Sequence, residues 1–352
     1  MKTPCPEKLS DYLYYLELDG YDFTAVPEND PPLSCGGCST VRKGSLYGRN
    51  LDLGYCETPE FIVRMSAADG RFASIGLCAD LSVAGSVSEL TAAALRRVPN
   101  VTSDGINENG VIVSVNVVVA DGVDDMSGTA PGKTPVHATR LVRYLLDRAS
   151  SAEHAAELMG QIDIVGDFSG YALHWMIADA ADTYVVEIIG GKLIFSRNRQ
   201  YYLTNFYLNL GPELPKQFIG GRCFENLPLL NDYAIGVERY CVLRDGYDGV
   251  RTAEDMTALM RSVRATASYD RTNDPLWYSE FCGGEVSIRS EKQVLEKELT
   301  RQIGLYEARD RSDPKGDWIT WNTSVYDIEA RSLTVFSQED YSTAFRYRLS
   351  AD

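Results

Sequence analysis

The segments that decide the fold are Gly36-Gly37-Cys38-Ser39-Thr40 and, a few residues on, Gly48-Arg49-Asn50-Leu51-Asp52. Cutting the Gly37–Cys38 bond would make Cys38 the first residue of a new chain. Its α-amine, with a pKa of about 7.7–8.0, would then be a base on the same residue as the nucleophilic thiol. A nearby arginine can lower the pKa of a thiol, and an aspartate can orient an amine. The pattern therefore predicts an N-terminal cysteine nucleophile.

The same residues predict a β-hairpin, because Lys43-Gly44 is a short-turn signal between two strand-like segments. A two-residue loop there places Cys38 opposite Arg49, and a three-residue loop places it opposite Asn50. Arg49 and Asp52 are three residues apart, so a regular strand points them to opposite faces. Both side chains would reach the cysteine only if the chain bends or bulges between them.

Further motifs follow in an order that resembles the choloylglycine hydrolase and penicillin V acylase family, whose members are N-terminal nucleophile hydrolases of linear amides. These motifs are short segments that contain polar or aromatic residues at expected turns and strand ends. They are Asp104-Gly105-Ile106-Asn107-Glu108-Asn109-Gly110, Leu173-His174-Trp175-Met176-Ile177-Ala178-Asp179, Leu203-Thr204-Asn205, Glu238-Arg239-Tyr240, Ser324-Val325-Tyr326-Asp327 and Leu333-Thr334-Val335. Together with the Cys38 segment, these motifs run from about residue 37 to residue 337.

The resemblance implies an α+β fold, a four-layer α-β-β-α sandwich with two antiparallel sheets. The order of elements fits this layering, because strands and helices occur in blocks. Strands are expected at 111–119, 171–178, 183–189, 318–328 and 331–336, and helices at 139–147, 151–159 and 252–262. Residues 38–352 form a single domain in this interpretation. Residues 1–37 are expected to be a propeptide that covers the site until cleavage; an ordinary N-terminal strand and loop is the alternative.

The resemblance also assigns roles to individual residues. Cys38 would attack the amide carbonyl, Arg49 would stabilise the thiolate, and Asp52 would accept a hydrogen bond from the α-amine. Asn205 would donate to the oxyanion, and Arg239 would belong to a charge network near the nucleophile. The structural alternatives are a small buried cysteine, a solvated strand or helix arginine, and a turn-forming aspartate or asparagine.

Asn116 is the candidate for a second oxyanion donor. Its distance from Gly110 is one residue shorter than in bile salt hydrolases, and one residue reverses the face to which a strand side chain points. A structural asparagine is therefore the alternative. His174, beside Trp175 on an apolar strand, is expected to be a core histidine, which favours amine-based catalysis over a Cys-His dyad.

Composition narrows the classes of partner. The chain has 352 residues and a formal net charge of −16, which argues against nucleic acid or an anionic membrane as a partner. The N-terminal segment has no apolar signal-peptide core, and the eight scattered cysteines indicate reduced thiols, so a cytoplasmic protein is expected. The resemblance to bacterial linear amide hydrolases implies a bacterial protein. Cys35 and Cys38 form a Cys-x-x-Cys pair without a second pair, so no metal or other cofactor is expected.

These observations predict hydrolysis of a linear carbon–nitrogen amide bond in a small N-acyl compound of the bile salt, penicillin V or N-acyl amine type. The rivals are an acyltransferase that passes the acyl group to an amine, and a non-catalytic binding protein that keeps the fold unprocessed. A metal- or redox-active protein using Cys35 and Cys38 is a third. By analogy with the family, a homodimer or homotetramer is the expected assembly.

Overall fold

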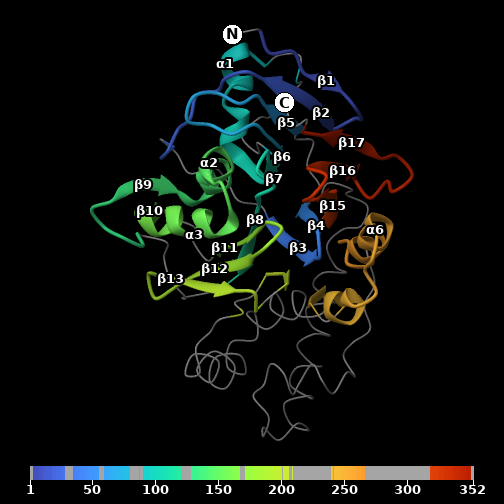
Figure 1. Ribbon diagram of the computed structural model, residues 1–352. Coiled ribbons are helices and arrows are strands. Elements are labelled where there is room, and N and C mark those ends of the chain that lie inside the picture. The colour runs from blue at the N-terminus through green and yellow to red at the C-terminus, as the bar shows by residue number, and fades with distance from the viewer. Residues whose placement is uncertain are drawn as a thin grey trace, which may run out of the picture.

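Two packed β-sheets with helices on their outer faces make up the computed structural model (Figure 1). The structure describes residues 3–27, 35–54, 59–79, 87, 90–119, 128–166, 171–199, 201–205, 208, 239–240, 242–265 and 318–349. Among these residues, no helix is long and apolar enough to cross a membrane.

The larger sheet has nine strands, in the order β1-β2-β5-β6-β7-β8-β11-β12-β13. Neighbouring strands are antiparallel except β2 and β5, which are parallel. The expectation of purely antiparallel sheets is therefore wrong at this one pair. The strand bounds are β1 Glu7–Lys8, β2 Leu13–Leu18, β5 Glu60–Met65, β6 Ser74–Ala79, β7 Thr102–Asn107, β8 Ile112–Val119, β11 Tyr171–Ala178, β12 Thr183–Ile189 and β13 Lys192–Arg197.

The smaller sheet has six strands in the order β14-β3-β4-β15-β16-β17, and every neighbouring pair is antiparallel. Its bounds are β14 Tyr202–Leu203, β3 Cys35–Lys43, β4 Leu46–Gly54, β15 Trp318–Asp327, β16 Ser332–Ser337 and β17 Phe345–Arg348. A separate parallel pair joins β9 (Thr134–His137) to β10 (Ile162–Val165).

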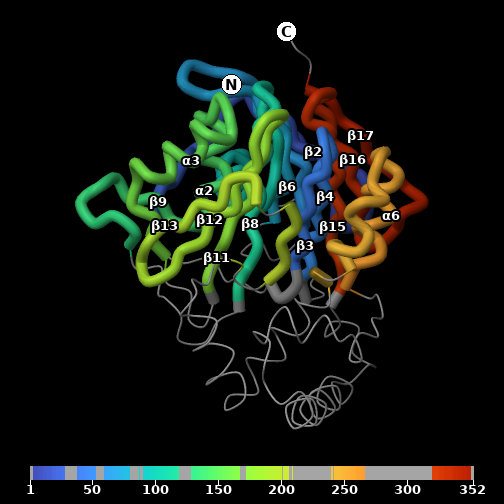
Figure 2. The backbone as a smooth tube through the Cα atoms, turned by 60° about the horizontal axis from the view of Figure 1, so that its bottom comes forward, coloured from blue at the N-terminus to red at the C-terminus, as the bar shows by residue number. Residues whose placement is uncertain are grey.

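Helices cover the outer face of each sheet, which gives four layers (Figure 2). Helices α2 (Leu141–Arg148) and α3 (Ala152–Gln161) lie on the nine-stranded sheet. Helix α6 (Ala253–Ser262) lies on β4 and β15 of the six-stranded sheet. Shorter helical segments are α1 (Ala92–Leu95), η2 (Val98–Val101) and η3 (Ala138–Arg140). The α-β-β-α sandwich expected from the sequence is thus confirmed.

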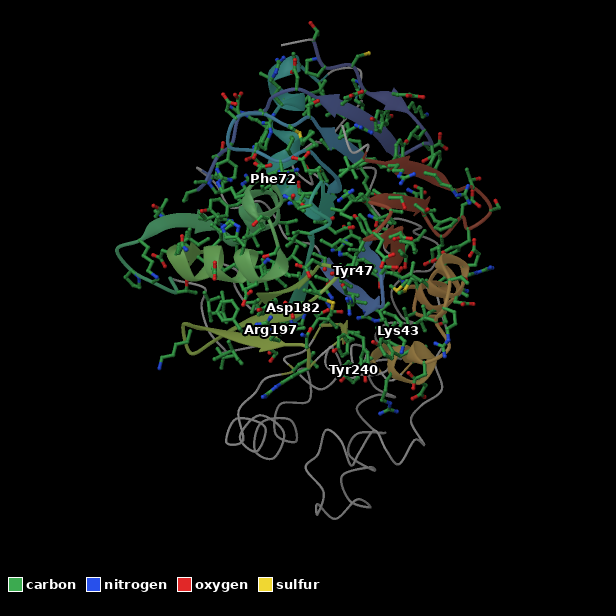
Figure 3. All side chains as sticks on the ribbon, viewed as in Figure 1. Lys43, Tyr47, Phe72, Asp182, Arg197 and Tyr240 are labelled. Atoms are coloured by element: carbon green, nitrogen blue, oxygen red, sulfur yellow. The ribbon has the colours of Figure 1, made fainter. Side chains whose placement is uncertain are left out.

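Apolar side chains fill the space between the two sheets. Tyr47 and Tyr326 of the smaller sheet pack against Ile62, Ile112 and Met176 of the larger one. The Tyr47 ring, labelled in Figure 3, meets the Tyr326 ring edge-on, and the Tyr47 hydroxyl lies 2.6 Å from the Ser114 hydroxyl. This pairing satisfies a polar group in an otherwise apolar layer, so the sheets have a fixed relative position here.

The strand and helix expectations agree with the structure to within one or two residues at most boundaries. Helix α2 starts two residues later than expected because a 3₁₀ turn, η3, precedes it. A capping box begins helix α6: the Thr252 hydroxyl accepts from the Asp255 backbone, and the Asp255 carboxylate accepts from the Thr252 backbone.

The N-terminal segment lies inside the larger sheet. Residues Leu13–Leu18 form β2, and the side chains of Leu13 and Leu16 are fully buried. This part of the segment is therefore a core strand of the larger sheet. Whether the chain is cut at Cys38 is a separate matter, and the division at residue 37 stays a prediction.

Asn107 fixes the turn between β7 and β8. Its Oδ1 accepts hydrogen bonds from the backbones of Asn109 and Val111, both at 3.1 Å. Its Nδ2 donates to the carbonyls of Leu146 and Ala149 at the end of α2, at 3.1 and 2.8 Å. One buried side chain therefore holds both a β-turn and the neighbouring helix.

We expect Asn107→Ala to lower the free energy of unfolding by about 3 kcal/mol, because it leaves several buried backbone groups unsatisfied. Urea denaturation measures this change. Asn109→Ala is the matched control, since Asn109 is exposed and contributes only its backbone to the turn. Equal midpoints for the two variants would show that the Asn107 side chain does not hold the turn.

Candidate active site

The hairpin that carries Cys38 has a two-residue loop, Gly44-Ser45, because Lys43 pairs with Leu46. Gly44 has φ of +62°, as a two-residue turn with glycine in its first position requires. The loop expected at Lys43-Gly44 is therefore displaced by one residue. As a result Cys38 pairs with Leu51, and the expected pairing with Arg49 or Asn50 is wrong.

Two β-bulges flank β4 beside Cys38. On β3 the extra residue is Gly36, since Cys35 pairs with Leu53 and Gly37 with Asp52. On β15 the extra residue is Trp321, opposite the same part of β4. The expected irregularity thus lies on the two neighbouring strands, while β4 itself runs regularly through Asn50 and Leu51. Bulges of this kind redirect side chains and are frequent next to active sites.

Three side chains hold Cys38. Its sulfur lies 3.9 Å from Arg49 Nη2, its backbone N–H donates to Asn205 Oδ1 at 3.0 Å, and its carbonyl accepts from Arg239 Nη1 at 2.6 Å. The cysteine is fully buried. Residues far apart in the sequence therefore converge on both the thiol and the peptide group.

Arg49 is itself buried, with a side chain only 1% exposed. Its Nη1 pairs with Asp104 Oδ1 at 2.8 Å, and its Nη2 donates to the Val115 carbonyl at 2.9 Å. Because Nη2 is also the atom next to the Cys38 sulfur, the guanidinium links the larger sheet to the thiol.

Asp104 is the site residue to which the sequence motif assigned no role. Besides Arg49, its carboxylate accepts hydrogen bonds from Ser103, Ser324 and Tyr326 at 2.6–2.8 Å. The signal was present, since Asp104 opens the Asp-Gly-Ile-Asn-Glu-Asn-Gly turn. A carboxylate bound by this many donors holds the arginine in one position.

Asp52 reaches the site from the other face of β4, across from Gly37 in the strand register. Its Oδ1 accepts from the Thr320 hydroxyl at 2.6 Å, and its Oδ2 lies 3.9 Å from Arg239 Nη1. Burial raises the pKa of Asp52 to about 7, and Arg239 opposes this rise. A carboxyl group with this pKa can give or take a proton at neutral pH.

Asn205 and Arg239 form a connected pair around the Cys38 peptide group. Asn205 Oδ1 accepts from Arg239 Nη2 at 2.5 Å, and Asn205 Nδ2 donates to the Val117 carbonyl at 2.7 Å. Arg239 Nη1 also donates to the Ser39 hydroxyl at 2.9 Å. The neighbouring Tyr240, labelled in Figure 3, packs its ring 4.7 Å from that of Tyr202 on β14.

Asn116 lies one step further from the cysteine. Its Oδ1 accepts from the Thr40 hydroxyl at 3.0 Å, and its Nδ2 donates to the carbonyls of Leu203 and Thr204 at 3.4 and 3.2 Å. These contacts hold the strand that leads to Asn205, as the structural alternative suggested. The oxyanion role of Asn116 stays a prediction.

His174 supports the same strand from the neighbouring position in the sheet. Its Nε2 donates to the Thr204 carbonyl at 2.8 Å, and its Nδ1 lies 3.3 Å from Glu187 Oε1. Both nitrogens of this fully buried ring have protein partners, as expected for a core histidine. Three of the site residues expected from the sequence, Arg49, Asn205 and Arg239, contact Cys38. Asp52 lies across from Gly37 and beside Arg239, and Asn116 lies one step further from the cysteine.

Part of the chain matches the model of a known protein family. Residues 37–205 match the family model of linear amide C-N hydrolases, choloylglycine hydrolase family. The resemblance expected from the motifs is thereby confirmed for this part of the chain, which includes Cys38, Arg49, Asp52 and Asn205. A comparison with curated proteins finds no match.

Solved structures similar to this chain include two forms of the conjugated bile acid hydrolase from Clostridium perfringens, a mutant and a variant. Their identities are 15% and 14% and their TM-scores 0.45 and 0.43, with 89% of this chain and 92% of each relative covered. Penicillin V acylase from Agrobacterium tumefaciens is 17% identical, with a TM-score of 0.42 and coverage of 89% and 86%.

We expect Arg49→Lys to shift the alkylation of Cys38 by iodoacetamide to higher pH and to slow it about tenfold at pH 7. A lysine is a point charge and cannot contact Asp104 and the thiol together. Mass spectrometry of the Cys38 peptide at a series of pH values measures the profile. The control is Arg64→Lys on β5, whose side chain donates to the Arg348 carbonyl at 3.0 Å. An unchanged profile for Arg49→Lys would remove Arg49 from the thiol's environment.

Glu60 makes the stability of the protein depend on pH. It is buried between the sheets, where Asn322 donates to its Oε1, and burial raises its pKa to about 8. Between its unfolded pKa of about 4.3 and this value, Glu60 binds its proton more tightly in the folded state than in the unfolded state. The free energy of unfolding is therefore highest at low pH and falls as the pH rises through this range.

We therefore expect Glu60→Gln to lose less stability than the wild type between pH 5 and pH 8, by up to about 1.4 kcal/mol per pH unit. Urea midpoints across this range give the comparison, with Glu157→Gln at an exposed position of α3 as the control. Parallel curves for wild type and Glu60→Gln would contradict a protonated Glu60.

Proposed function

We propose that Cys38 cuts the Gly37–Cys38 bond and then acts as an N-terminal nucleophile that hydrolyses a linear carbon–nitrogen amide bond. The observation that carries this proposal is that three side chains contact Cys38: Arg49 at the sulfur, Asn205 at the backbone nitrogen and Arg239 at the carbonyl. An inert buried cysteine has no need of such partners.

In the first step the Cys38 sulfur attacks the Gly37 carbonyl carbon. The carbon–nitrogen bond breaks, the nitrogen takes up a proton to become the free amine, and residues 1–37 are left as a thioester on the sulfur. Water then hydrolyses the thioester, which regenerates the thiol and gives Gly37 a carboxylate. Asp52 is the proposed proton carrier, a role supported by its position opposite Gly37 and its pKa of about 7.

In the second step the same thiol attacks the carbonyl of an amide substrate, and the new α-amine passes the proton to the leaving amine. Asn205 is the proposed oxyanion donor through Nδ2, while its Oδ1 holds the α-amine nitrogen, which already donates to this atom as the peptide N–H. Losing such a donor typically lowers the rate about 10²–10³-fold. The acyl group leaves the sulfur as a carboxylate when water attacks the acyl-enzyme.

The first measurement is the intact mass of the purified protein, together with its N-terminal sequence. We expect a chain that begins at Cys38, and we expect Cys38→Ala to remain uncut. Cys78→Ser is the matched control: Cys78 is also buried, but burial raises its thiol pKa to about 12, so its loss should leave cutting unaffected. A wild-type chain that stays uncut favours the non-catalytic binding protein.

The second measurement is a screen of linear N-acyl amides, including conjugated bile salts and penicillin V, for release of free amine. A covalent acyl adduct should form on Cys38 in the wild type and in Cys78→Ser, and should be absent from Cys38→Ala. Added amine acceptors distinguish transfer from hydrolysis. A cut chain that forms no adduct with any amide would overturn the hydrolase.

A further inference from the structure

We infer that residues 1–37, once cut from Cys38, stay bound to residues 38–352 as a non-covalent subunit of the working enzyme. This inference rests on the proposed cleavage at the Gly37–Cys38 bond. It is carried by residues 3–27, which the structure describes.

The backbone of this segment is built into the larger sheet. Strand β2 pairs along its whole length with β5, from Leu13 opposite Glu60 to Leu18 opposite Met65. On its other side β2 pairs with β1, so removal of residues 1–37 would take both strands and leave β5 as an edge. Once β2 is gone, the apolar strand β5 would have an unpaired edge, and such edges tend to pair with other chains.

Side chains of β2 belong to two apolar clusters. Leu13 packs with Ile62 in the layer between the sheets, and Leu16 packs with Phe61 and Val63 on the outer face. Leu13 and Leu16 are 0% exposed. Loss of the segment would uncover both faces of β5 at once, which a soluble protein rarely tolerates.

Beyond β2 the segment is fixed again by polar contacts. The Tyr21 hydroxyl donates to Asp147 Oδ2 at 2.5 Å, at the end of α2. Asn100 bridges two further positions: its Nδ2 donates to the Asp22 carbonyl at 2.8 Å, and its Oδ1 accepts from the Thr24 backbone at 2.9 Å. The segment is thus anchored from Leu13 to Thr24, well before the Gly37–Cys38 bond.

Cutting at Cys38 therefore frees a chain end without freeing the segment. Figure 1 shows β1 and β2 beside β5 at the upper end of the molecule, whereas β3, which begins just before Cys38, lies lower in the view. Strand β2 stays paired with β5 wherever the new ends at residues 37 and 38 lie. The two chains then form one folded unit.

Size-exclusion chromatography and native mass spectrometry of the processed wild type test this inference. We expect one species with the two chains in a 1:1 ratio, which separates only under denaturing conditions. A folded, monodisperse chain of residues 38–352 that lacks residues 1–37 would overturn it.

A variant pair tests the anchor. We expect Leu16→Asp to lower the ratio of bound residues 1–37 several-fold or to abolish the folded protein, because it places a charge in the outer cluster. Glu17→Gln, exposed on the same strand, should retain the full ratio. A stable Leu16→Asp protein that keeps a 1:1 ratio in dilute urea, as the wild type does, would contradict the anchor.

A protease site inserted after Asp30 in the Cys38→Ala chain separates this inference from the proposed function. After cutting, the N-terminal piece should stay bound, whether or not the wild type cuts itself. Its release into a folded remainder would overturn the inference while leaving self-cleavage untouched. An uncut wild type with a bound N-terminal piece here would instead count against the proposed function alone.

Discussion

The buried ion pair between Arg49 and Asp104 is the interaction on which the site depends. It joins β4 of the smaller sheet to β7 of the larger one, and both side chains are almost completely excluded from solvent. A buried charge without its partner is strongly destabilising, so the two sheets must meet at a distance that keeps the pair intact. The hydroxyls of Ser324 and Tyr326 complete the coordination of Asp104, which leaves the guanidinium one position, beside the Cys38 sulfur.

Two β-bulges lie at the part of β4 where side chains from opposite faces approach the Gly37–Cys38 segment. Arg49 and Asp52 point to opposite faces of β4, yet both lie beside the Gly37–Cys38 segment. Arg49 reaches the thiol from between the sheets, and Asp52 lies across from Gly37 on the outer side, near Arg239. The extra residues at Gly36 and Trp321 fall at this point of the strand, where they change the local twist on both sides of Asp52. The site therefore surrounds a peptide bond as much as a thiol.

Asn116 and His174 show how the fold supports the segment that leads to Asn205, the proposed oxyanion donor. The short strand β14 is held through the carbonyls of Leu203 and Thr204, by Asn116 from one position and His174 from the next. The Asn205 amide follows directly and contacts both the Cys38 nitrogen and Arg239. Such hydrogen bonds fix the position of a functional group before any substrate binds, which is the basis of electrostatic preorganisation.

Most strands and helices could be predicted from the sequence, because periodicity and turn signals are local properties. The layered α+β fold and the residues Cys38, Arg49, Asp52, Asn205 and Arg239 were expected from the resemblance of the ordered motifs to a known family. Only tertiary contacts determine the hairpin register, the parallel pairing of β2 with β5, the contact of Asp104 with Arg49 and the supporting position of Asn116. Each of these depends on contacts between segments far apart in the chain, which no local pattern encodes. A shift of one residue in a turn moves every side chain of the strand beyond it to the opposite face of the sheet. The packing of the two sheets selects the register in which Cys38 pairs with Leu51, and this register determines the geometry of the site.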